Sequence, residues 1–239
     1  MTPLAALVFA RCVGFVVRAP GFSHARVPVP VRAALAFALA VGLVPALGRA
    51  NSAPPAVPLV AALVFEFLLG AAIGFAASLL YEGAAAGGRM LDEYVGIQVA
   101  NPAATLGTGQ AFQQLWGLGF LAAFFVLDGY QVVILALADS LTRIPPGDAF
   151  ATPHLDAFAV AVPGIVLRAG LLVAGPALAL GLVANVALGS ISRIIPRFSN
   201  FTLTFPVVFF AVLLATLVTL PVVLQQGGRP WLPAALSVR

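Results

Sequence analysis

Residues 57–81 read VPLVAALVFEFLLGAAIGFAASLLY and form a long apolar run. It carries one charged residue, Glu66, and it is longer than the roughly 20 apolar residues that a membrane-spanning helix needs. Gly70 and Gly74 are four residues apart, a spacing that lets the backbone of another membrane helix approach closely. The sequence therefore predicts a long apolar helix that packs tightly against a neighbour.

Glu66 is the unfavourable residue in this helix. A carboxylate that faces lipid is costly, so we expect the side chain to face protein or water. A structural role and a functional or inter-subunit role both remain open for it. Glu66 also begins a row of residues at four-residue steps, a row that drifts about 40° per step around a helix; its members are Glu66, Gly70, Gly74, Ser78 and Glu82.

The composition of the 239 residues points to a membrane protein. Hydrophobic residues make up 62% and charged residues 8%, whereas a soluble domain has roughly 25% charged residues. The chain therefore lacks the polar surface needed in water, and lipid or other membrane subunits must cover its apolar surface. All twelve basic residues are arginines scattered singly, which argues against nucleic-acid binding. Cys12 is the only cysteine, so the chain can form no internal disulfide and no CxxC motif.

Six apolar stretches follow one another, at residues 3–17, 31–48, 57–81, 112–141, 157–189 and 201–224. The first carries Arg11 and lacks a basic start, so we expect a retained helix and not a signal peptide. The fold class is predicted to be all-α and integral to the membrane, with about six hydrophobic segments in a single domain over residues 1–239. Several segments are expected to be broken into helical hairpins packed in a multi-subunit assembly.

Interruptions within these stretches support that expectation. Asp128-Gly129 favours a turn, which would leave two short helices at residues 112–127 and 132–141. The fifth stretch contains Pro163 and Pro176, and the sixth contains Pro206 and Pro221. Each proline removes a helical hydrogen bond and tends to kink or break the helix. Helices of this kind need partners.

No motif for chemistry is present. His24 and His154 are isolated, and neither an HExxH motif, a P-loop nor a GxSxG elbow occurs, so we predict no catalytic residue, no metal site and no cofactor. Asn101-Pro102-Ala103 matches the NPA box of aquaporins, but a second box is missing. A self-contained small-solute channel or transporter is kept as the alternative, and an intramembrane enzyme comes third.

The segment from Arg89 to Gln114 separates the third and fourth stretches. Its second part is small, flexible and uncharged. Irregular backbone at membrane depth is tolerated only where it lines a cavity or lies inside protein. The segment is therefore either a plug that lines a pore or a solvent-exposed connection.

The whole chain resembles the FliR/SctT family of type III protein export-gate subunits, because five motifs occur in the same order. They are RAPGF at 18–22 with VPVPVR at 27–32, EFLLGAAIGF at 66–75, GGRMLDEYVGIQ at 87–98, DGY at 128–130 leading into ADSLTRIPPG at 138–147, and NVALGSISRIIP at 185–196. Each motif alone is weak, but their joint order and spacing are fairly specific.

The resemblance implies a structural, pore-forming subunit and not an enzyme. The implied partners are FliP-like and FliQ-like gate subunits, an FlhB-like switch protein, the basal-body ring, the lipid membrane and unfolded export substrates, with no nucleic acid. The implied place is the bacterial inner membrane at the flagellar basal body. The resemblance does not distinguish a flagellar export system from an injectisome.

The resemblance also implies site residues. Seven residues are predicted to serve helix packing or subunit contact: Glu66, Gly70, Gly74, Asp139, Asn185, Arg193 and Pro196. Twelve residues are predicted to form a plug loop in the pore: Val99, Ala100, Asn101, Pro102, Ala103, Ala104, Thr105, Leu106, Gly107, Thr108, Gly109 and Gln110. The loop departs from the family pattern, since it has no bulky aromatic or Met side chain before Phe112.

Overall fold

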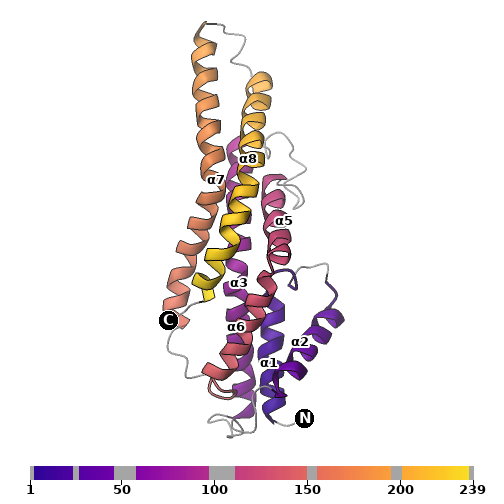
Figure 1. Ribbon diagram of the computed structural model, residues 1–239. Coiled ribbons are helices and arrows are strands. Elements are labelled where there is room, and N and C mark those ends of the chain that lie inside the picture. The colour runs from indigo at the N-terminus through magenta and orange to yellow at the C-terminus, as the bar shows by residue number, and fades with distance from the viewer. Residues whose placement is uncertain are drawn as a thin grey trace. The chain divides into compact units, whose positions relative to one another are not determined.

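A computed structural model describes residues 3–23, 27–45, 58–96, 111–149, 155–194 and 201–236. Every regular element in these residues is a helix, which confirms the all-α prediction (Figure 1). The helices are α1 (Pro3–Arg18), α2 (Val29–Leu43), α3 (Leu59–Val95), α5 (Ala111–Val126), α6 (Gly129–Arg143), α7 (Leu155–Ile194) and α8 (Phe201–Leu236).

Three segments in the described residues are long and apolar enough to cross a membrane, namely Leu59–Leu79, Val162–Ile194 and Phe205–Leu224. A fourth is reached if α5 and α6 together count as one bent span. The prediction of an integral membrane protein is thus confirmed, with three or four candidate spans within the described residues.

The break expected at Asp128-Gly129 is present. α5 ends at Val126 and α6 begins at Gly129, with Asp128 between them at φ 56°, ψ 25° in the left-handed region. Aspartate adopts this conformation more readily than most residues with a side chain.

The prolines do not break their helices, while a kink at each of them stays a prediction. α7 continues for 40 residues through Pro163 and Pro176, and α8 continues through Pro206 and Pro221. Proline removes one intrahelical hydrogen bond, and in membrane helices neighbouring groups can compensate for that loss. The apolar residues on both sides of each proline continue the helix.

The chain divides into two compact units. The first unit comprises residues 1–79, 124–161 and 230–239, and the second comprises residues 80–123 and 162–229. Both are parts of one chain, and the prediction of one membrane-embedded domain over residues 1–239 stays a prediction.

The first unit has its core between α1 and the beginning of α3. Val8, Cys12 and Phe15 are fully buried on α1, and α6 adds Val133 and Leu137. α2 contacts α1 through an edge-to-face pair of Phe9 and Phe37, whose ring centroids are 6.3 Å apart.

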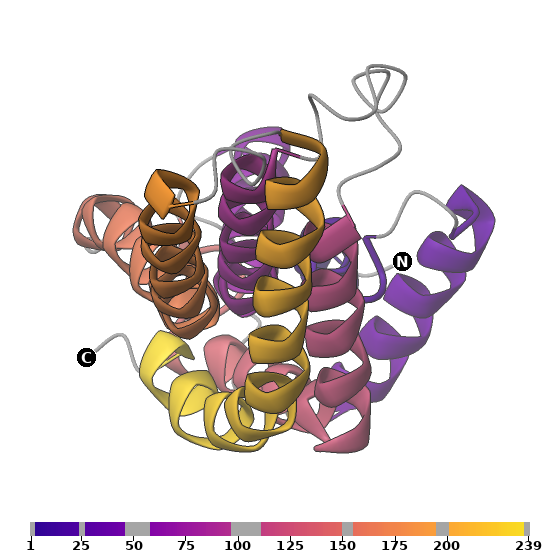
Figure 2. The ribbon, with the colours of Figure 1, turned by 90° about the horizontal axis from the view of Figure 1, so that it is seen from above.

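In the second unit, the end of α3 packs with α5, α7 and α8 (Figure 2). The rings of Phe112 on α5 and Phe209 on α8 lie 5.8 Å apart, and Val212 of α8 approaches Gly181 of α7. α8 therefore contacts both α5 and α7.

Candidate functional site

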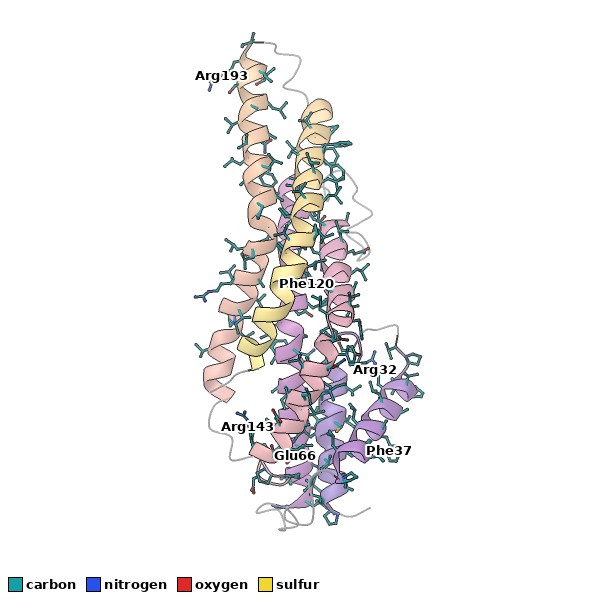
Figure 3. The ribbon with its side chains drawn as sticks, in the orientation of Figure 1. Arg32, Phe37, Glu66, Phe120, Arg143 and Arg193 are labelled. Carbon is teal, nitrogen blue, oxygen red and sulfur yellow. The ribbon has the colours of Figure 1, made fainter. Side chains whose placement is uncertain are left out.

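Glu66 is the centre of a buried polar cluster in the first unit (Figure 3). Its Oε2 accepts a hydrogen bond from Nε of Arg11 at 2.6 Å, and both side chains are completely buried. α1 and α3, which are apolar helices, thus each contribute one charge to an ion pair inside the protein.

The remaining polar atoms of this pair are also satisfied. Nη1 of Arg11 donates to the carbonyl oxygen of Ser140 at 2.9 Å, and Nη2 donates to that of Ile144 at 3.0 Å. The backbone N–H of Gly147 donates to Oε1 of Glu66 at 2.8 Å. The cluster therefore ties the end of α6 and the loop after it to α1 and α3. Charges buried in this way are tolerated only because they are paired and hydrogen-bonded.

Three glycines make room for the ion pair. A Cβ atom on Gly70 of α3 would collide with the carbonyl oxygen of Arg11, and one on Gly14 of α1 would collide with that of Phe67. A Cβ atom on Gly74 would lie 2.5 Å from the carbonyl oxygen of Phe15. The two backbones thus approach as closely as glycine permits, the arrangement that GxxxG spacing favours.

Asp92 is the second buried acid, on the end of α3 in the second unit. Its two carboxylate oxygens accept the backbone N–H groups of Phe112 and Gln113, each at 3.0 Å. These N–H groups belong to the first turn of α5, which has no intrahelical partner for them. Burial raises the pKa of Asp92, while the two backbone hydrogen bonds act in the opposite direction.

Glycines also mark the crossing of α3 and α7. A Cβ atom on Gly83 would collide with Cβ of Ala169, and one on Gly87 would lie 2.6 Å from the carbonyl oxygen of Gly170. Further along, the side-chain amide of Asn185 on α7 donates to the hydroxyl of Tyr94 on α3 at 2.7 Å.

The seven residues predicted for packing or subunit contact lie in different surroundings. Glu66, Gly70 and Gly74 meet α1, and Asn185 meets Tyr94. Asp139 on α6 is exposed. Arg193, in the last turn of α7, is exposed as well (Figure 3). Pro196 and the whole predicted plug loop, residues 99–110, lie outside the described residues. A role of any of these residues in subunit contact or gating stays a prediction.

The sequence reasoning missed Arg11 as the partner of Glu66, and it missed Asp92 as the cap of α5. A signal for the first existed, since two apolar stretches each hold one opposite charge that lipid would not tolerate. For the second, the local sequence held no signal, because Asp92 lies within α3 and 20 residues before Phe112.

Each of the two buried acids accepts two hydrogen bonds from the chain itself, so each acid joins helices within its own unit. Within the ranges that the structure describes, no group of three or more His, Cys, Asp or Glu residues could hold a metal ion.

A sequence profile of the family described as bacterial export proteins, family 1, matches residues 2–231. Among curated proteins, the chain is similar to a flagellar biosynthetic protein FliR of Pectobacterium carotovorum subsp. carotovorum, with 27% identity over 146 residues. That alignment covers 59% of this chain and 54% of the relative, so the chain spans about half the length of the curated relative that it matches. The resemblance to the FliR/SctT family is confirmed. Because the profile covers nearly its whole length, this chain belongs to the bacterial export proteins, family 1.

Proposed function

We propose that this chain is a structural, pore-forming subunit of a type III protein export gate that helps unfolded substrates cross the inner membrane at a flagellar basal body. Its proposed partners are FliP-like and FliQ-like subunits, an FlhB-like switch protein and the basal-body ring. The proposed role is architectural and involves no catalysis.

The proposal rests on the large apolar surface that the helices leave exposed. In the membrane-capable segments of α7 and α8, 22% of the most apolar window is buried within the chain, and in α3 the share is 33%. Exposed apolar side chains on α7 and α8 include Leu182, Val183 and Phe210. Such surface needs lipid or neighbouring subunits, and membership of an export family favours subunits.

Co-purification tests this function. The tagged chain is expressed alone and together with P-type and Q-type gate subunits, and each preparation is examined by size-exclusion chromatography with mass determination. We expect the chain to form a defined complex with the subunits. A stable, monodisperse chain that ignores those subunits would contradict the proposal.

Transport is the second part of the test. A strain that lacks this chain should stop secreting export substrates, and the wild-type gene should restore secretion. Unchanged secretion without the chain would contradict the proposed role in conduction.

A further inference from the structure

Arg168 is a charged residue within the apolar part of α7. It lies in the apolar segment Val162–Ile194, and its side chain is exposed. With the residues that the structure describes, the guanidinium of Arg168 forms neither a hydrogen bond nor an ion pair. Arg11, on the apolar helix α1, is by contrast paired with Glu66. Among the described residues, Arg168 therefore lacks the counter-charge that Arg11 has.

Arg168 lies on the face of α7 that points away from its own unit. The opposite face is packed, since Ala177 is fully buried and a Cβ atom on Gly170 would lie 3.3 Å from the carbonyl oxygen of Gly83 on α3. At about 100° per residue, Arg168 is about 160° from Gly170 and about 180° from Ala177. The packing that holds α7 in the second unit therefore leaves Arg168 outside.

The surface around Arg168 is apolar. We call it the Arg168 face and define it by residues that lie within about 60° of Arg168 around the helix; they are Gly164, Arg168, Leu171, Gly175, Leu182 and Val186. Its three large side chains, Leu171, Leu182 and Val186, are 55%, 60% and 62% exposed. Whatever covers these side chains also covers the guanidinium, and a covered charge needs an opposite charge beside it.

The first unit shows how this chain covers an arginine on an apolar helix. α1 docks on α3, where Glu66 supplies the carboxylate for Arg11. One turn further along α3, a Cβ atom on Gly70 would collide with the carbonyl oxygen of Arg11, so the missing side chain lets the two backbones approach closely. The partner of Arg11 is thus an apolar helix with an acid and a nearby small residue.

The Arg168 face offers the same kind of surface as α1. Gly14 follows Arg11 by three residues on α1, and Gly164 precedes Arg168 by four on α7. A Cβ atom on Gly164 or Gly175 would meet nothing within 4 Å, so the backbone on both sides of Arg168 is open to close approach. Small residues at such positions let another helix pack directly against the backbone.

We propose that the Arg168 face docks an apolar helix of another gate subunit, and that an Asp or Glu side chain of that helix pairs with Arg168. This inference rests on the proposed function, and it names the surface and the chemistry of one subunit contact. Charge complementarity selects an acidic helix, because a guanidinium enclosed by apolar side chains is tolerated only when it is paired and hydrogen-bonded. The open backbone at Gly164 and Gly175 favours a helix over a lipid headgroup.

Photo-crosslinking identifies what covers this face. A benzophenone amino acid replaces Leu171, one turn from Arg168, in cells that make the whole gate, and mass spectrometry identifies the crosslinked peptide. The matched control position is Leu180, which is 40% exposed but lies about 120° from Arg168 around α7. We expect position 171 to crosslink to an apolar peptide of another gate subunit that contains Asp or Glu, and position 180 not to reach that peptide. Crosslinks from position 171 only to phospholipid, or only to a second copy of this chain, would overturn the proposal.

Charge exchange tests the ion pair itself. Arg168→Glu should lower the yield of co-purified complex at least about tenfold, because two acids then face each other in the contact. Arg143→Glu, at an exposed arginine of α6, is the control and should leave the yield unchanged. Replacing the acid of the crosslinked peptide by Arg should restore assembly of the Arg168→Glu chain. An unchanged yield for Arg168→Glu, or a loss that the exchanged charge does not restore, would overturn the pairing.

Two further measurements keep this test separate from other failures. Arg168 lies outside the packing of its own unit, so the purified Arg168→Glu chain should unfold in detergent at the same temperature as the wild type; a lower temperature would show that the residue acts within the chain and would overturn the proposal. Failure of the wild-type chain to co-purify with the gate subunits would contradict the proposed function itself. Normal assembly of both the wild-type and the Arg168→Glu chains would overturn this inference alone.

Discussion

Arg11 and Glu66 depend on each other because each is a charge that the chain has removed from water. Arg11→Met or Glu66→Met alone leaves the other charge buried and unpaired, which we expect to cost about 3–5 kcal/mol of unfolding free energy. The double variant leaves no buried charge, so it should be less destabilised than the sum of the two single variants. Thermal unfolding of the purified chain in detergent measures all three.

Arg143→Gln is the control for that experiment, because Arg143 is an exposed arginine at the end of α6 (Figure 3). It should leave the unfolding temperature nearly unchanged. Strictly additive losses in the double variant would show that the two charges do not stabilise each other.

A second prediction concerns Asp92, which accepts hydrogen bonds from the first turn of α5. Asp92→Ala removes both acceptors of the backbone N–H groups of Phe112 and Gln113, and each buried donor left without a partner costs about 1–3 kcal/mol. Asp92→Asn keeps one acceptor oxygen and removes the cost of burying a charge, so it should be clearly less destabilising. Hydrogen exchange at the start of α5 measures the effect locally, and equal protection in the two variants would contradict the capping role.

Local sequence patterns predict only part of the cluster around Glu66. The cost of a carboxylate in an apolar helix predicts that Glu66 avoids lipid. It does not identify Arg11, which is 55 residues away, because no local pattern fixes which helices become neighbours. Ser140, which accepts through its carbonyl oxygen and its Oγ, and Gly147, which donates its backbone N–H, could not be predicted either, because no local pattern places α6 and the loop after it beside α1.

At the scale of elements, the closeness of α1 and α3 rests on Gly70. Gly70→Leu cannot be accommodated against the carbonyl oxygen of Arg11, so we expect loss of the folded chain and of its complex with gate subunits. Gly42→Leu is the matched control, since a Cβ atom at Gly42 of α2 would meet nothing within 4 Å. Co-purification yields of the two variants provide the comparison. Normal assembly of the Gly70→Leu variant would refute the packing role.

The break between α5 and α6 gives another prediction for an element. Asp128 has φ 56°, so Asp128→Val, with a branched side chain, should lose about 1–2 kcal/mol, whereas Asp128→Gly should be neutral or stabilising. Asp139→Val is the control, since it places the same side chain in regular helix on α6. Unfolding temperatures of the isolated variants test this, and an equal loss for both valine variants would contradict strain at position 128.

The elements also show where sequence patterns succeed and fail. Asp128-Gly129 marks a true break, because a turn-forming pair in left-handed backbone cannot continue a helix. The prolines at 163 and 176 mark none, since long apolar flanks outweigh one lost hydrogen bond. α3 extends to Val95, well past its apolar stretch, because Gly83, Gly87 and Gly88 pack it against α5 and α7.

At the scale of the whole molecule, the plug loop stays a prediction. Deleting residues 101–108 should let small solutes leak through the assembled gate while the complex remains intact, because a pore without its plug stays open. Dye release from liposomes that contain the complex measures this. Unchanged permeability in an intact complex would remove the plug assignment, and the unmodified complex in the same liposomes is the control.

The sequence separation within the ion pair has a consequence for biogenesis. A ribosome that adds roughly 5–20 residues per second makes Glu66 about 3–11 seconds after Arg11, and Ser140 later still. During that interval the guanidinium of Arg11, on the newly synthesised α1, has no carboxylate with which to form an ion pair. The insertion machinery must therefore shelter α1 until α3 emerges, so a depleted insertase should harm this chain more than one whose first helix is uncharged.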